Sequence, residues 1–233
     1  MDTNDFFYFL LFEDWNYVWL IAAGVLVFVG LLFLRKALKP DLIKSVKWLN
    51  FGYAAFIITY GIAKYVFMGS NYYIERGMDN TFEFEIIYRL GLVLSYIALA
   101  FLINTIERYL LKTIINTKGL ITLLPIVNAI LCVFVSYELL RNINMILMPV
   151  YLFIVILSYG IVAMKGTGMV RSSAIFSIVG LLLLFIAFFL DTRFFKELFT
   201  NLGMRWFIFI VPPIMAIIGI SIFYYSSTPK KEA

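Results

Sequence analysis

Long apolar runs separated by short polar segments make up almost the whole chain. A membrane-spanning helix needs about 20 mostly apolar residues. The seven stretches of about that length are 15–34, 49–68, 84–106, 119–137, 145–164, 172–190 and 206–225. The runs are solidly apolar and do not alternate with polar residues, and backbone groups in lipid must pair within their own segment. Each run therefore predicts an α-helix.

Basic residues are distributed unevenly between the segments that connect these runs. One predicted side carries Arg35, Lys36, Lys39, Lys44, Lys47, Arg108, Lys112, Lys118, Lys165, Arg171, Lys230 and Lys231. The other side carries Arg76, Arg141, Arg193, Lys196 and Arg205. Because cytoplasmic loops of membrane proteins are enriched in Lys and Arg, we expect the N-terminus outside and the C-terminus in the cytoplasm.

Composition supports a membrane protein and excludes an ordinary soluble domain. Of the 233 residues, 63% are hydrophobic and 14% are charged, and the mean hydropathy is +0.96. Soluble domains average about 45–50% apolar and about 25% charged residues. The predicted fold is a single all-α domain over residues 1–233, a bundle of seven transmembrane helices in the plasma membrane, surrounded by lipid. No connection is long enough for a soluble output domain, so a signalling role would require a separate partner.

The residue types that most enzymes and metal sites use are scarce. The chain has no histidine, and Cys132 is its one cysteine. Histidine-based nucleophile activation and histidine or cysteine metal clusters are therefore excluded. We expect no enzymatic activity, no metal and no other cofactor. The sequence pI of about 9.2 follows from the basic loops, so we expect no nucleic-acid partner.

Ionisable and hydroxyl groups cluster where the second and third predicted spans approach the outer surface. Tyr60 and Lys64 lie one turn apart in the second span, while Glu85, Arg89 and Tyr96 lie in the third. Further polar groups at similar depth are Glu83, Tyr88, Ser95, Glu138 and Asp191. Charges within membrane spans are costly and often functional. The five residues predict an outward-facing pocket for a small or lipidic ligand. The alternative is that Lys64 and Arg89 reach the interface and pair with Glu85.

The cytoplasmic end of the third span carries the triplet Glu107-Arg108-Tyr109. It resembles the Glu/Asp-Arg-Tyr motif of rhodopsin-like receptors, and that resemblance implies a surface facing a cytoplasmic partner. The last span departs from that family, because it lacks Asn-Pro-x-x-Tyr. It also has no lysine between 206 and 225, so a retinal linkage like that of microbial rhodopsins is not expected. The alternative is a charged helix end with an aromatic anchor.

Pro212 and Pro213 lie in the middle of the last predicted span. Each proline removes a helix donor and crowds the carbonyl four residues earlier. The pair therefore predicts a kink or break. Its functional interpretations are a hinge or a break that coordinates a cation, and the alternative is a passive kink.

Three functions are compatible with these patterns. The first is a receptor-like or sensory protein with an outer pocket and a cytoplasmic partner. The second is a transporter or channel for a small, anionic solute, in which Lys64 and Arg89 select charge. The third is a structural subunit of a membrane complex, which needs no site.

Overall fold

Helix accounts for all the regular structure in the residues that the computed structural model describes, which are 3–12, 16–79, 81–111 and 119–227. The elements in chain order are α1 (Thr3–Phe12), α2 (Asn16–Ala37), α3 (Lys44–Glu75), α4 (Phe82–Thr105), the π-helix η1 (Ile106–Leu111), α5 (Leu120–Phe134), α6 (Tyr137–Lys165), α7 (Gly168–Leu190), α8 (Arg193–Asn201) and α9 (Arg205–Ser226).

Six helical segments are long and apolar enough to cross a membrane. They are Asn16–Ala37, Lys44–Glu75, Phe82–Leu111, Tyr137–Lys165, Gly168–Leu190 and Trp206–Ser226. These six segments indicate an integral membrane protein. The run predicted at 119–137 forms α5, which has 15 residues. At 1.5 Å per residue, α5 is roughly 22 Å long, shorter than a hydrocarbon core of about 30 Å. A seventh span therefore stays a prediction.

Several helices extend beyond the apolar runs that predicted them. α3 continues to Glu75 rather than ending at 68, and α6 begins at Tyr137 rather than at 145. Helical hydrogen bonding does not depend on apolar side chains, so a helix continues into the polar interface where hydropathy falls. As a result, the polar residues around Arg141 are helical.

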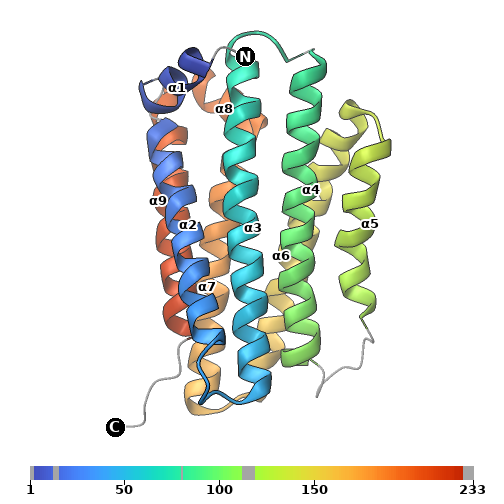
Figure 1. Ribbon diagram of the computed structural model, residues 1–233, viewed down its shortest axis with the longest axis vertical. Helices are drawn as coiled ribbons and strands as arrows, with labels where there is room; N and C mark the ends of the chain where they lie inside the picture. The colour runs from blue at the N-terminus through green and yellow to red at the C-terminus, as the bar shows by residue number, and fades with distance from the viewer. Residues whose placement is uncertain (1–2, 13–15, 80, 112–118, 228–233) are drawn as a thin grey trace.

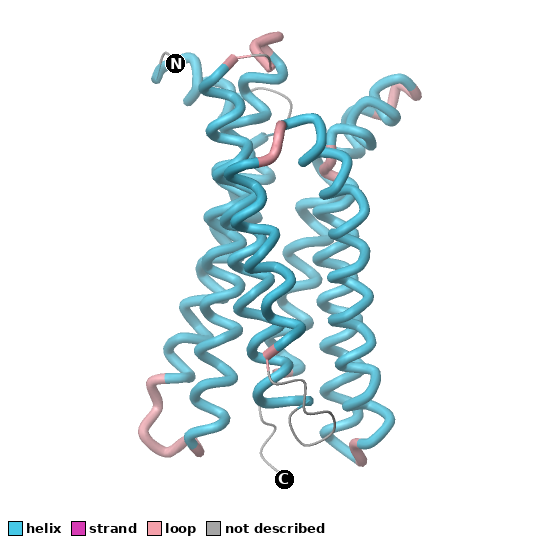
Figure 2. Tube along the Cα trace, turned by 90° about the vertical axis from the view of Figure 1, so that its right-hand side faces the viewer, coloured by secondary structure: helices cyan, strands magenta, loops and turns pink. Residues whose placement is uncertain are grey.

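The long helices run along one axis, antiparallel to their chain neighbours (Figures 1 and 2). α2 lies between α3 and α9, α4 packs along α3, and α9 packs along α7. α5 lies at the edge of the bundle against α4, while α6 contacts α7 and η1. The C-terminal ends of α2, α6 and α9 therefore lie together, at the end of the bundle away from the N-terminus (Figure 1).

Two short helices, α1 and α8, lie at the N-terminal end of the bundle (Figure 1). In α1, Phe9 is fully buried, while Asp5 accepts hydrogen bonds from the Tyr72 hydroxyl at 2.5 Å and from Arg76 at 2.9 Å. These two donors lower the pKa of Asp5 below its ordinary value of 3.8, the Tyr72 hydroxyl more strongly. Neither segment is long enough to span a membrane, so the apolar runs in the sequence predict neither helix.

The outer surface of the long helices is apolar. Phe28 on α2, Val133 on α5 and Phe153 on α6 are 60%, 60% and 65% exposed. In water, so many exposed large apolar side chains would be an aggregation hazard. Their distribution over the long helices is what contact with lipid requires.

Candidate functional site

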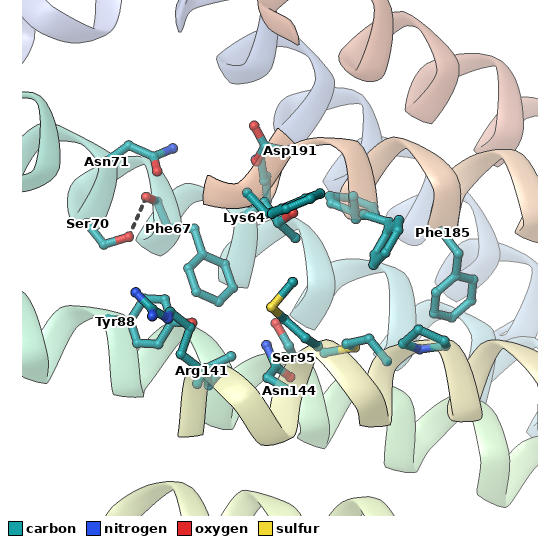
Figure 3. Close-up of a pocket in the computed structure, with 18 of the residues that line it drawn as sticks. Lys64, Phe67, Ser70, Asn71, Tyr88, Ser95, Arg141, Asn144, Phe185 and Asp191 are labelled. Atoms are coloured by element: carbon teal, nitrogen blue, oxygen red, sulfur yellow. Dashed lines mark hydrogen bonds and ion pairs between the residues drawn. The ribbon is translucent and has the colours of Figure 1, made fainter. Parts of the chain in front are cut away.

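A cavity of about 450 Å³ lies among α3, α4, α6 and α7 in the half of the bundle nearer the N-terminus. Its wall also includes Asp191, Thr192 and Phe194 at the α7–α8 turn. Figure 3 shows α3 and α7 on one side of the cavity and α4 and α6 on the other. Ligand pockets typically measure about 300–1,000 Å³, so this space is large enough for a small molecule.

Lys64 and Asp191 form an ion pair in the cavity wall. The Lys64 side chain is 3% exposed and the Asp191 side chain 9%. The Lys64 ammonium lies 3.6 Å from the ring centroid of Trp19, which supplies a cation–π contact. Lys196 of α8 lies 3.3 Å from the second carboxylate oxygen of Asp191. Lys64 is therefore compensated inside the protein, and its partner is Asp191 rather than Glu85.

Tyr60 precedes Lys64 by one helical turn and lines the same cavity. Its ring meets that of Phe188 edge-on, with centroids 4.3 Å apart. Of the five residues predicted to bind a ligand, Tyr60 and Lys64 line this cavity, and the other three do not.

Glu85 and Arg89 lie between α4 and α5. Arg89 donates to the Glu85 carboxylate at 2.5 and 3.1 Å, as the pairing alternative expected. The same guanidinium donates to the backbone carbonyls of Cys132 at 2.8 Å and Val133 at 3.3 Å. The last carbonyls of a helix lack partners within it. Arg89 thus supplies hydrogen-bond donors to carbonyls at the C-terminal end of α5, which is a structural role.

Tyr96 contacts the cavity through a neighbour. Its hydroxyl donates to Asn144 Oδ1 at 2.7 Å, and Asn144 lines the cavity. The Tyr96 ring meets that of Tyr151 at 5.9 Å, and Asn128 of α5 donates to the Tyr151 hydroxyl. Two hydrogen bonds and one aromatic contact therefore connect the cavity wall on α6 to α4 and α5.

In the triplet at the end of the third span, Glu107 is buried, whereas the two residues after it are not. Glu107 is 4% exposed and accepts hydrogen bonds from the backbone N–H groups of Gly119 at 2.9 Å and Thr122 at 3.1 Å, and from the Thr122 hydroxyl at 2.6 Å. It therefore caps the N-terminus of α5, where a carboxylate is favourable. Arg108 is exposed and Tyr109 is half-buried, so these two remain accessible to a partner.

Helix α9 continues through Pro212 and Pro213 without interruption. The helix therefore has no break at this point, and the kink and the hinge stay predictions. The two prolines leave the carbonyls of Ile208 and Phe209 without their usual donors, yet both residues are buried. Close packing of α9 against α7 holds the helix together on the C-terminal side of the prolines.

The sequence prediction missed the polar residues that α6 contributes to the cavity, Arg141, Asn142 and Asn144. The predicted apolar run begins only at 145, so the sequence pattern places these residues in a loop, whereas α6 already begins at Tyr137. Arg141 and Asn144 are three residues apart, which is a helical spacing, and they directly precede an apolar run. This spacing is the signal that could have extended the predicted helix. Within the described residues, no group of three His, Cys, Asp or Glu side chains is placed to hold a metal ion.

No protein-family model, curated protein or solved structure matches this chain, so the inferences about function below rest on its residues and geometry alone.

Proposed function

We propose that this protein is a receptor-like or sensory membrane protein that binds a small or lipidic ligand in the cavity among α3, α4, α6 and α7. One observation carries the proposal. The cavity occupies one half of the bundle, and a largely buried ion pair, Lys64 with Asp191, forms part of its wall. Ionisable groups within membrane spans are costly and typically mark functional sites.

The proposed topology has seven spans, with the N-terminus outside and the C-terminus in the cytoplasm. The basic ends of α2, α6 and α7 lie at the end of the bundle opposite the cavity. The positive-inside rule assigns that end to the cytoplasm. The cavity then faces outward, and the accessible Arg108 and Tyr109 face a cytoplasmic partner.

The other half of the bundle is tightly packed, and this supports a sensor more than an open channel. Leu99 and Val155 are fully buried, and the hydroxyl groups of Tyr53 and Tyr159 lie 2.6 Å apart in the interior. Ligand contact with Asn144 would alter the hydrogen bond to Tyr96. The contacts of Tyr96 with Tyr151, and of Tyr151 with Asn128, would pass that change to α5.

Filling the cavity with protein tests the binding site. Met148 lines the cavity, whereas Met164 on the same helix is 78% exposed. In lipid nanodiscs, we expect small amphiphiles to raise the Tm of the wild type, and we expect Met148→Trp to abolish this rise. Met164→Trp should preserve it. Equal ligand responses in both variants would place binding elsewhere and overturn the proposal.

A transporter is the second candidate, because a cavity open to one side and closed to the other is also the geometry of alternating access. Solute flux into proteoliposomes separates the two functions. Flux that Met148→Trp abolishes and Met164→Trp retains would establish transport. Ligand binding without flux would support the sensor.

A further inference from the structure

The charges that line the cavity do not balance. The charged side chains among the lining residues are Lys64, Asp191 and Arg141. Lys64 is neutralised by Asp191. Arg141 is exposed, and no carboxylate in the described part of the chain lies within ion-pairing distance of it, including Glu138 one turn earlier. The cavity therefore carries one uncompensated positive charge, located on α6.

The polarity of the wall changes along the cavity. Figure 3 shows Arg141, Ser70 and Asn71 at one end and Phe185 at the other. The side-chain amides of Asn71 and Asn142 make no hydrogen bond within the residues that the structure describes, so their donors are available. The inner part is lined by apolar residues, among them Leu92, Met148, Leu152 and Phe185. Such a gradient matches a ligand with a polar head and an apolar tail.

We propose that the cavity binds an anionic amphiphile with a single apolar chain, a deepening that rests on the proposed function. The carboxylate or phosphate head contacts Arg141 at the outer end, and the chain extends toward Phe185. A guanidinium presents paired N–H donors that match the oxygens of such a head group. A cationic head would meet the same guanidinium as a like charge.

The ion pair in the wall explains why the head does not bind deeper. A second anion beside Lys64 would compete with Asp191, which already occupies that cation. Displacing it would leave a buried carboxylate without its main partner, which is strongly unfavourable. The cavity volume of about 450 Å³ lies toward the lower end of the range for ligand pockets. It therefore suits one short chain.

Three probes with the same ten-carbon chain test the head group. Decanoate, decanol and decyltrimethylammonium differ in charge, and acetate supplies the carboxylate without the chain. Saturable binding is measured with radiolabelled decanoate on the full-length protein in zwitterionic nanodiscs, after subtraction of empty nanodiscs. The unlabelled probes compete. We expect decanoate to compete best, decanol more weakly, and decyltrimethylammonium and acetate least.

Arg141→Gln should weaken decanoate binding about 10- to 100-fold, the range for one charge-assisted hydrogen-bonding partner. It should leave decanol competition unchanged. Arg171→Gln, an exposed arginine at the opposite end of the bundle, should bind like the wild type. If the three ten-carbon probes compete equally, or if Arg141→Gln has no effect, the preference for an anionic head group is refuted. Ligand binding in the cavity would still be supported. If acetate competes as well as decanoate, the contribution of the ligand's apolar chain to binding is refuted. If no probe binds, the proposed function falls as well.

Discussion

Gly180 of α7 and Gly219 of α9 bring the backbones of two helices into direct contact. A Cβ atom built on Gly180 would lie 2.7 Å from the carbonyl oxygen of Gly219, and one built on Gly219 would lie 2.6 Å from the carbonyl oxygen of Gly180. Lipid leaves no hydrophobic driving force between helices, so close packing through small residues is a main source of helix association. This contact holds α9 against α7 beyond its two prolines.

Gly180→Ala should therefore destabilise the protein, by about 1–3 kcal/mol for an overpacked interface. Gly160 on α6 is the matched control, because a Cβ there would meet no atom within 4 Å. Gly160→Ala should leave stability unchanged or raise it by up to about 1 kcal/mol, since alanine favours helix. Thermal unfolding in detergent measures both. Equal Tm values for the two variants would show that the α7–α9 contact is not tight.

The ion pair in the cavity wall predicts non-additive mutations. Asp191→Leu leaves Lys64 buried without its carboxylate partner and should lower the free energy of unfolding by about 3–5 kcal/mol. Lys64→Met should cost less, because Lys196 still faces Asp191. The double variant should be more stable than Asp191→Leu alone. A double-mutant cycle on unfolding free energy tests this, and additive effects would contradict direct coupling.

Glu107 should stabilise α5 rather than contact a partner. Glu107→Ala removes the acceptor for the N–H groups of Gly119 and Thr122 and for the Thr122 hydroxyl, and should cost about 1–3 kcal/mol because partly buried donors lose their partner. Hydrogen exchange should accelerate in the first turn of α5. Arg108→Ala, on the exposed neighbour, should change stability by less than about 0.5 kcal/mol. Unchanged exchange in Glu107→Ala would exclude the capping role.

Attachment of α1 to the bundle should weaken in acid. The pKa of Asp5 in the folded protein lies below 3.8, its ordinary value. The carboxylate therefore contributes its full stabilisation above about pH 4, and this is lost as the pH falls through the lowered pKa. Limited proteolysis of the N-terminal segment should become faster below pH 4. Asp5→Asn should be cleaved faster at neutral pH and show less pH dependence. A variant with the wild-type profile would assign the acid response to another group.

Much of the helical architecture was predictable, because lipid forces backbone hydrogen bonds to close within each segment. Each of the seven apolar runs contains a helix, and six of the helical segments are long enough to span. Helix ends were less predictable. The start of α6 lies among polar residues such as Arg141 and Asn144, which hydropathy alone assigns to a loop although they continue a helix.

The membrane class, the helical secondary structure and the charge asymmetry followed from local composition, which needs no knowledge of neighbours. Tertiary packing decided which polar groups meet. Glu85 and Arg89 were predictable as a pair, because they are four residues apart on one helix. Lys64 and Asp191 are 127 residues apart in the sequence, so only the packing of α7 against the α2–α3 side of the bundle brings them together. The packing of α4 against α5 placed Arg89 at the end of α5 and Glu107 at its start. It is likewise the tertiary structure that leaves Arg141 without a carboxylate partner among the described residues.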